Sequence, residues 1–587
     1  MLGGDIASTA TPELEARRIV VDFGDNPDAR AGEPVKLAGD AFEIARPSPK
    51  SIAVSAGSNR GLIHGVCDLM EKLGANFAPG APARFPQTDP ATLSKVKPYR
   101  VEPAFSRRAF ASDLMTWNYT FPERLEEHLK FDRQFIGWMG RRGANAFEYI
   151  RHAHDTRLRI DQIVDESSAW GIDNEYGGHV LPILMPRERF ESNPEYFPAS
   201  PDAKREARGN LCVSNRDALK VVADGAVAWL REYPENRLLH IWGADVSGGA
   251  WCACAQCSEL SPQIQYMTVV NAVAGADEVA ASGVLVTYLA YHDTIDPAPG
   301  LKPLANVMFE WAPRERCYAH AIDDRACETN RRYFGSLKRY IEIFQGRGHV
   351  FEYYADAILF GGLGFATPSI IARDLLAYRK LGIGGVSCLT FGAYSVLASA
   401  VNLEAFVRAA RSPDFESEEA TDAAAAGRHP QTHVMAKAYR AIEKATALIL
   451  DYGEVMTPYK MPARKAASKK QDLARALKQI ESAVDIAKEL GARDALCAAE
   501  AELWSFGLEI VEGLGDYLRA REENGVVRRM LGEAAIANIA AAIDHIRAID
   551  AETKGTWGAY DLEWIREIWL DGLRKHLAEK GGGGDLF

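Results

Sequence analysis

The sequence has no long hydrophobic run. No stretch approaches the roughly 18 consecutive apolar residues that a membrane-spanning helix needs. The first twenty residues also lack the apolar core of a secretory signal. We therefore expect no membrane partner. The chain is then either cytoplasmic or a periplasmic or secreted protein whose signal peptide is absent from this sequence.

Positive charge is in short supply as well. The chain has 68 Lys and Arg residues against 80 Asp and Glu residues, a net charge of −12 at pH 7. It contains no basic run with interleaved aromatic residues, which is what a surface that follows a phosphate backbone needs. Nucleic acid is therefore not an expected partner.

Cysteine is scarce too. Nine cysteines in 587 residues are too few for a disulfide-built scaffold, and an odd number leaves at least one thiol unpaired or bound to a metal. The rest of the composition, 47% hydrophobic and 25% charged residues, is that of a globular protein with a large core. The length suggests about three domains.

Residues 1–100 are predicted to form a small α/β domain. Short β-type runs at 17–23, 42–46 and 51–57 accompany one amphipathic helix at 60–74, and a proline-rich segment follows.

Residues 101–415 have a different pattern, in which short apolar strands end in polar or aromatic residues and helices lie between several of them. Eight such strands predict a (β/α)8 barrel of the TIM type, whose active site is built at the carboxyl ends of the strands. The predicted strands are 106–114, 144–151, 171–181, 238–245, 283–293, 306–313, 348–356 and 384–393.

Residues 416–587 contain no strand pattern. Ala-rich segments with apolar residues at three-to-four spacing predict a C-terminal α-helical domain. The wide apolar stripes of these helices need covering. We expect the domain to pack against the barrel, with part of this surface available for a homodimer.

Acids and aromatic residues dominate the predicted strand ends. A cleft lined with carboxyl groups and flat rings suits glycoside hydrolysis, in which one carboxyl protonates the leaving oxygen and another activates water or attacks. The rings stack on the sugar, and this chemistry needs no cofactor. The side chains expected to contact the sugar are Trp117, His179, Trp242, Tyr288, His292, Trp311 and Tyr354.

The catalytic acid is predicted to be Asp245. This residue ends the strand 238–245, and Trp242 with the glycines that follow suggests a carboxyl held on an apolar wall, which raises a carboxyl pKa. Glu310 and Glu352 belong to later strands, near the opposite wall of the mouth, where a water-activating base would stand. This arrangement predicts an inverting enzyme.

Two other classes of function fit the same pattern. A catalytically inactive carbohydrate-binding barrel would have the same lining. A metalloenzyme would use His179, His292 and strand-end acids to bind a catalytic metal. Hydrolysis of aryl glycosides would distinguish a glycosidase from the inactive binding barrel, and metal analysis would test the metalloenzyme.

Three of the nine cysteines stand within six positions just after Asp245. Their C-x-C-x-x-C spacing is compatible with a structural zinc, with disulfides in an oxidising compartment, or with free buried thiols. We expect the loop after the sixth strand to lie within bonding reach of them, with His320 as the fourth zinc ligand. The residues are Cys252, Cys254 and Cys257 on one loop, and Cys317, His320 and Cys327 on the other.

Five segments carry a resemblance to a known family. They are GSNRGLIHGVCDLMEKLG, GHVLPILMPRERFESNPEYFP, LCVSNRDAL, GADVSGGAWCACAQC and RCYAHAIDDRACETN. The chain resembles a bacterial family of unassigned function, of the DUF4838 type. Its members join an α-glucuronidase-like N-terminal domain to a barrel related to α-glucuronidases and β-hexosaminidases. The resemblance covers roughly residues 17–415.

The resemblance implies a sugar-active barrel. In α-glucuronidases a strand-four acid protonates the leaving group and acids on later strands activate water, which corresponds here to Asp245 and then to Glu310 and Glu352. β-Hexosaminidases carry an adjacent Asp-Glu pair on strand four, whereas Val246 follows Asp245 here. This difference disfavours the alternative of a hexosaminidase-like retaining glycosidase.

The substrate implied by the resemblance is an oligo- or polysaccharide from which a terminal uronic or related acidic sugar is removed by exo action. A uronic acid needs a fixed cation opposite its carboxylate, and arginine forks suit that planar group. The first two strands offer Arg107, Arg108, Arg151 and His152.

Overall fold

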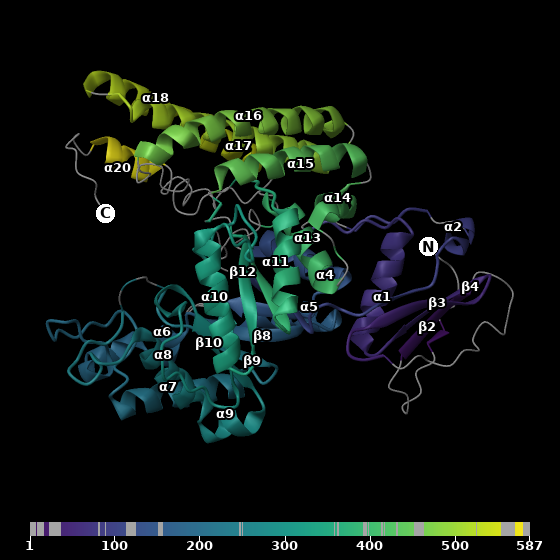
Figure 1. The fold of residues 1–587 in the computed structure, drawn as a ribbon. Coiled ribbons are helices and arrows are strands. Elements are labelled where there is room, and N and C mark those ends of the chain that lie inside the picture. The colour runs from purple at the N-terminus through teal and green to yellow at the C-terminus, as the bar shows by residue number, and fades with distance from the viewer. Residues whose placement is uncertain are drawn as a thin grey trace.

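The computed structural model contains a small antiparallel sheet, a closed barrel and a set of long helices (Figure 1). In Figure 1 the sheet lies to one side of the barrel, and the helices α15 to α18 lie above it. The residues that the structure describes are 7–8, 17–22, 37–79, 83–87, 90–112, 125–150, 157–245, 248, 250–356, 359–360, 363–390, 396, 398–412, 415, 417–429, 432–450, 463–492, 494–523, 525–552 and 570–578.

The N-terminal sheet has the strand order β1-β2-β4-β3-β5. Helix α1 packs on it, and the apolar side chains between them are fully buried, among them Phe42 and Val54. Ser58 caps α1, because its side chain accepts a hydrogen bond from the N–H of Gly61. The elements are β1 (Ala7–Ser8), β2 (Arg17–Asp22), β3 (Phe42–Ser48), β4 (Ser51–Ala56), α1 (Asn59–Lys72), α2 (Pro90–Ser94) and β5 (Tyr99–Val101).

The barrel is closed by eight parallel strands in the order β6 to β13, which confirms the predicted fold class. All eight strands fall within the predicted segments. They are β6 (Arg107–Ser112), β7 (Ala146–Ile150), β8 (Asp173–Gly178), β9 (Leu238–Ile241), β10 (Leu285–Ala290), β11 (Val307–Trp311), β12 (Gly348–Ala355) and β13 (Gly385–Thr390).

Helices surround the barrel and cover the outward faces of its strands (Figure 1). A parallel strand is buried on both faces in this arrangement, and all eight residues of β12 are buried. The helices are α4 (Leu125–Arg142), α5 (Arg157–Ala169), α6 (Leu181–Leu184), α7 (Arg216–Glu232), α8 (Pro262–Ala274), α9 (Asp277–Ser282), α10 (Glu328–Ile343), α11 (Pro368–Lys380) and α13 (Ala400–Arg411), with 3₁₀ turns at Arg187–Phe190, Pro194–Tyr196 and His292–Thr294.

The C-terminal helices pack against the barrel, as expected from their apolar stripes. Thr446 accepts a hydrogen bond from the backbone N–H of Ala366 at 3.2 Å, and Glu443 accepts one from the N–H of Ser369 at 2.8 Å. Among the described residues, no helix has both the length and the apolar character needed to cross a membrane. These helices are α14 (Ser417–Arg428), α15 (Thr432–Ile449), α16 (Ala463–Gly491), α17 (Ala495–Ala520), α18 (Gly525–Glu552) and α20 (Gly572–Ala578).

Candidate active site at the mouth of the barrel

Asp245 lies at the mouth of the barrel, just beyond the carboxyl end of β9. Its side chain is 59% exposed, so the described residues do not form the apolar wall expected around it. The Tyr291 hydroxyl donates a hydrogen bond to its Oδ1 at 3.3 Å. The Nε2 atoms of His179 and His292 lie 3.9 Å and 3.8 Å from the same oxygen. Two imidazoles and a phenol therefore surround this carboxyl group.

A second carboxyl group, that of Glu315, reaches the same imidazole from the loop after β11. The Nδ1 atom of His292 contacts Glu315 Oε1, and the side chain of Glu315 is 23% exposed. His292 has a φ of +45°, a left-handed conformation that is uncommon outside glycine and that clusters at active sites. The ring of His292 thus stands between the carboxyl groups of Asp245 and Glu315.

An arginine and two tyrosine rings complete the mouth. Arg314 Nε pairs with Asp356 Oδ2 at 3.0 Å, and its guanidinium lies 5.9 Å from the centre of the Tyr353 ring. The rings of Tyr353 and Tyr291 are stacked with centres 6.4 Å apart. Asp356 is 1% exposed and also accepts the backbone N–H of Leu359, so it holds Arg314 in place from behind.

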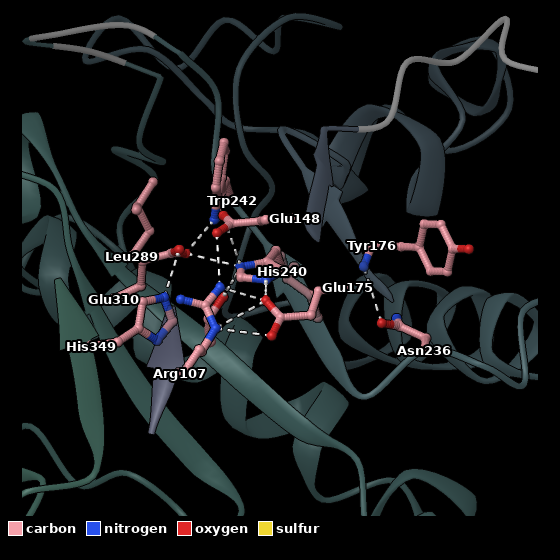
Figure 2. Close-up of polar contacts among 12 residues, drawn as sticks. Arg107, Glu148, Glu175, Tyr176, Asn236, His240, Trp242, Leu289, Glu310 and His349 are labelled. Atoms are coloured by element: carbon pink, nitrogen blue, oxygen red, sulfur yellow. Dashed lines mark hydrogen bonds and ion pairs between the residues drawn. The ribbon is translucent and has the colours of Figure 1, made fainter. Parts of the chain in front are cut away.

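Buried ionic groups fill the barrel interior (Figure 2). Arg107 on β6 donates from Nε to Glu175 Oε1 at 2.9 Å and from Nη2 to Glu148 Oε2 at 3.0 Å. Glu148 and Glu175 are register partners on β7 and β8, and both are almost fully buried. Arg107, one of the expected substrate contacts, is therefore already paired with two acids inside the barrel.

Glu310 joins the same network from the other side of the barrel (Figure 2). Its Oε2 lies 3.1 Å from His240 Nδ1 and accepts the indole N–H of Trp242 at 2.8 Å. Its Oε1 lies 2.9 Å from His349 Nε2. The edge of the Trp242 ring contacts His179 at 5.2 Å between ring centres, so this residue connects the interior to the mouth.

The buried charges balance only if one carboxyl group keeps its proton. Burial and the Glu310 carboxylate raise the pKa of Glu148 to about 8. Burial opposes ionisation of Glu175 as well, but the charge of Arg107 outweighs it and holds the pKa of Glu175 at about 2. Burial would lower the pKa of His240, but the charges of Glu148 and Glu310 raise it to about 10. Three carboxyl groups thus share the two cations Arg107 and His240, and Glu148 carries the extra proton.

The expectation that Glu310 and Glu352 line the mouth is wrong. Glu310 is 0% exposed, inside the barrel and behind Trp242. Side chains alternate between the two faces of a strand, and His349, Phe351 and Tyr353 of β12 face inward. Glu352, which lies between Phe351 and Tyr353, therefore points out of the barrel. Both carboxyl groups are fully buried and held by hydrogen bonds, so neither of them lines the mouth.

Glu352 belongs to an ionic cluster between the barrel and α11. Arg316 Nε lies 3.2 Å from Glu352 Oε1, and Arg316 also pairs with Asp374. The hydroxyl groups of Tyr318 and Tyr378 donate to Glu352. All these side chains are buried, so Glu352 has a structural role.

Several expected sugar contacts also lie elsewhere. Arg108 is buried and pairs with Asp40 of the N-terminal domain at 2.7 Å, which joins that domain to the barrel. Three aromatic side chains point outward: Tyr288 packs on α8 and α10, Trp311 packs on α10 and α11, and Tyr354 packs on α13. His179 and His292 do lie at the mouth, and Trp242 is just below it. Trp117, Arg151 and His152 fall outside the described residues.

A family model, the domain of unknown function DUF4838, matches residues 82–388, more than half of the 587 residues. The chain belongs to the DUF4838 family. This match covers seven strands of the barrel and most of the eighth, β13, but not the C-terminal helices. No curated protein matches the sequence.

Solved structures with the same fold are distant in sequence from this DUF4838 protein. One is a family 138 glycoside hydrolase that targets pectin rhamnogalacturonan II, with 11% identity and a TM-score of 0.55 over 92% of this chain and 90% of that chain. Another is a family 89 glycoside hydrolase from Clostridium perfringens, with 10% identity and a TM-score of 0.55 over 86% of this chain and 62% of that chain. The shared feature is the fold.

Sequence reasoning overlooked two of the mouth residues of the DUF4838 chain, Arg314 and Glu315. They follow β11 by three and four residues, whereas the strand itself ends at Trp311. The signal was the adjacent Arg-Glu pair directly after the Pro that terminates the strand. In a barrel, the residues just past a strand end line the mouth as often as the last strand residues do.

Six of the nine cysteines of this DUF4838 chain lie in two groups beside the barrel. Cys252, Cys254 and Cys257 are joined by Cys212 and not by His320, the fourth ligand expected from the sequence, which belongs to the second group. Cys212 lies in the segment LCVSNRDAL, 40 residues before Cys252. The second group is Cys317, His320 and Cys327, with 3.3 Å between Cys317 Sγ and His320 Nδ1.

Proposed function

We propose that this chain is a glycoside hydrolase whose catalytic carboxyl groups are Asp245 and Glu315. The observation that carries the proposal is their meeting at opposite sides of His292 at the barrel mouth. TIM-type barrels perform their chemistry at this end of the strands. Glycoside hydrolysis needs two carboxyl groups facing one bond. The same fold occurs in glycoside hydrolases, one of which acts on a pectic polysaccharide.

Asp245 is the proposed general acid and Glu315 the proposed base. Asp245 is the more exposed of the two, so a leaving group can depart past it into water. Glu315 is half-buried, and the His292 ring and the Tyr333 hydroxyl orient its two oxygens. This places the water-activating group in the fixed position that an in-line attack requires.

The proposed substrate is a glycan with a terminal uronic or related acidic sugar, removed by exo action. Arg314 supports this choice, because its guanidinium lies at the mouth beside the Tyr353 ring, where a sugar carboxylate and a sugar face would both find partners. An inverting mechanism is proposed with it. In such enzymes the two carboxyl groups are about 6.5–9.5 Å apart, which leaves room for water.

Variants of the two acids test the proposal. Asp245→Asn removes the transferable proton and should lower turnover of a natural acidic glycan by about 10² to 10⁴-fold, with a much smaller loss on aryl glycosides that have good leaving groups. Glu315→Gln should impair both kinds of substrate, because water is then unassisted. Glu342→Gln, on the exposed face of α10, is the matched control and should keep full activity.

Product configuration and substrate preference complete the test. Proton NMR of the first product should show inverted anomeric configuration, and retained configuration would overturn the inverting mechanism. Arg314→Met should raise KM for uronides without a similar change for neutral glycosides. If the Asp245→Asn and Glu315→Gln variants hydrolyse the glycan at the rate of the unaltered protein, the proposed site is wrong.

A further inference from the structure

Four cysteine sulfur atoms meet in one place beside the barrel mouth. Cys212, Cys252, Cys254 and Cys257 lie with their Sγ atoms all within 4.8 Å of one another. Three of these thiols are buried and Cys254 is half-buried. We infer that this chain binds a structural Zn²⁺ ion through these four thiolates. The proposed hydrolysis does not require this ion.

The distances between the sulfur atoms fit a tetrahedral ion. Four ligands at a Zn–S distance of about 2.3 Å are separated from each other by about 3.8 Å in a regular tetrahedron. Cys212 Sγ lies 3.7 Å from Cys254 Sγ and 3.9 Å from Cys257 Sγ. A disulfide requires about 2.05 Å between two sulfur atoms. The cluster thus has the dimensions of a metal site.

The donor set favours a soft tetrahedral ion such as zinc over Mg²⁺ and Ca²⁺, which prefer oxygen ligands. Four soft thiolates in tetrahedral geometry, with no position left for water, form a closed structural site. Neighbouring groups donate to the sulfur atoms, as they do at thiolate centres: the backbone N–H of Ala199 lies 3.4 Å from Cys252 Sγ, and Arg205 Nη1 lies 3.9 Å from it. These donors offset part of the negative charge of four thiolates.

The ion would join two connections that hydrogen bonds already link. Cys212 lies in the connection between β8 and α7, and the other three cysteines lie between β9 and α8. Asn210 already spans this gap, since its backbone N–H donates to Ala250 at 2.9 Å and its Oδ1 accepts the N–H of Ala244 at 2.8 Å. Ala244 directly precedes Asp245, so the ion would fix the loop that carries the proposed acid.

Metal content is the first measurement. The full-length protein, purified without chelator and under reducing conditions, should contain about one zinc per chain by mass spectrometry of the metal. Cys212→Ser and Cys254→Ser should each lose it. Cys327→Ser, which removes a half-buried thiol of the other cysteine group, is the matched control and should keep it.

Thiol labelling of the unaltered protein gives an answer even if a variant fails to fold. In the zinc-loaded protein, iodoacetamide should label the half-buried Cys327 and leave the half-buried Cys254 unmodified. Removing the zinc with a chelator should make Cys254 reactive, and adding zinc alone should protect it again.

Three results would overturn the inference. They are an absence of zinc with Cys254 reactive from the start, loss of zinc from Cys327→Ser but not from Cys212→Ser, and a disulfide among the four cysteines in the protein purified without reductant. None of these readouts depends on glycosidase activity. Failure of the proposed hydrolysis and failure of the zinc site are therefore distinguishable.

Discussion

At the scale of the residue, the proton on Glu148 makes the free energy of unfolding decrease as the pH rises. The folded pKa of Glu148, about 8, is above its ordinary value of 4.5, so the stability that its protonated form provides is fully present below pH 4.5 and is lost as the pH rises from there through 8. The folded pKa of His240, about 10, is above 6.5, so the stability that its charge provides is present below 6.5 and is lost as the pH rises through 10. Glu148 and His240 therefore both predict that the protein is less stable at alkaline pH than at mildly acidic pH.

Glu148→Gln isolates the carboxyl contribution. The amide resembles the protonated acid in shape and cannot ionise, so the fall in Tm between about pH 5 and pH 8 should be smaller in this variant than in the unaltered protein. Differential scanning calorimetry at the two pH values measures it. An equal fall in both proteins would show that Glu148 is already ionised at about pH 5.

Glu175→Gln is the comparison on the neighbouring strand. The folded pKa of Glu175, about 2, is below 4.5, so its stabilising charge is present above pH 4.5 and is lost as the pH falls through 2. This variant leaves Arg107 with one partner fewer and should have a lower Tm at both neutral and alkaline pH. The two glutamates should therefore behave oppositely at about pH 8, although both contact Arg107.

At the scale of the element, strand β12 is held to α11 by the buried cluster around Arg316. Its guanidinium is fully buried between Glu352 and Asp374. Arg316→Met leaves two buried carboxyl groups without a cation, and removing one partner of such a cluster costs about 3–5 kcal/mol of unfolding free energy. Urea unfolding of the two proteins measures the difference.

Arg332→Met on α10 is the control for that loss. Arg332 pairs with Asp296 at 2.7 Å, but its side chain is 62% exposed, and a surface pair contributes about 0–1 kcal/mol. If Arg316→Met lowers the free energy of unfolding by no more than Arg332→Met does, the structural role that we assign to the Glu352 cluster is wrong.

At the scale of the whole molecule, the C-terminal helices cover a loop of the barrel. Trp504 and Leu503 of α17 meet the segment that precedes α11 at Gly364, where an added Cβ would lie 2.5 Å from a Leu503 methyl carbon. Trp504 is 3% exposed. Tight packing of this kind predicts that the barrel and the helices unfold together.

Trp504→Ala should lower the stability of the barrel as well as that of the helices. The cavity should cost about 3–5 kcal/mol, and near-UV circular dichroism and far-UV circular dichroism should report the same lowered midpoint. Val526→Ala, at a position 74% exposed on α18, should leave the midpoint unchanged. Loss of helical structure in Trp504→Ala without any change in the barrel would show that the two regions fold independently.

Much of the architecture could be predicted from sequence, because it depends on local patterns. The eight apolar runs of the barrel are short and are separated by helices or turns, so their number and direction follow from chain order alone. The helices after residue 416 follow from three-to-four spacing. The family resemblance pointed to the same barrel; the family match confirms the resemblance, and the closed sheet of eight strands confirms the barrel.

The sequence alone determined the barrel, the long helices and the importance of the strand ends. Only the tertiary structure decided which side of each strand faces inward. A barrel strand is buried on both sides, so alternation of apolar and polar residues cannot distinguish the interior from the helix layer, and Glu352 was placed on the wrong side. The closure of the barrel likewise decides which loops meet. It brings Glu315 to His292, and Cys212 to Cys252, Cys254 and Cys257. Those contacts join residues far apart in the chain, and no local pattern records them.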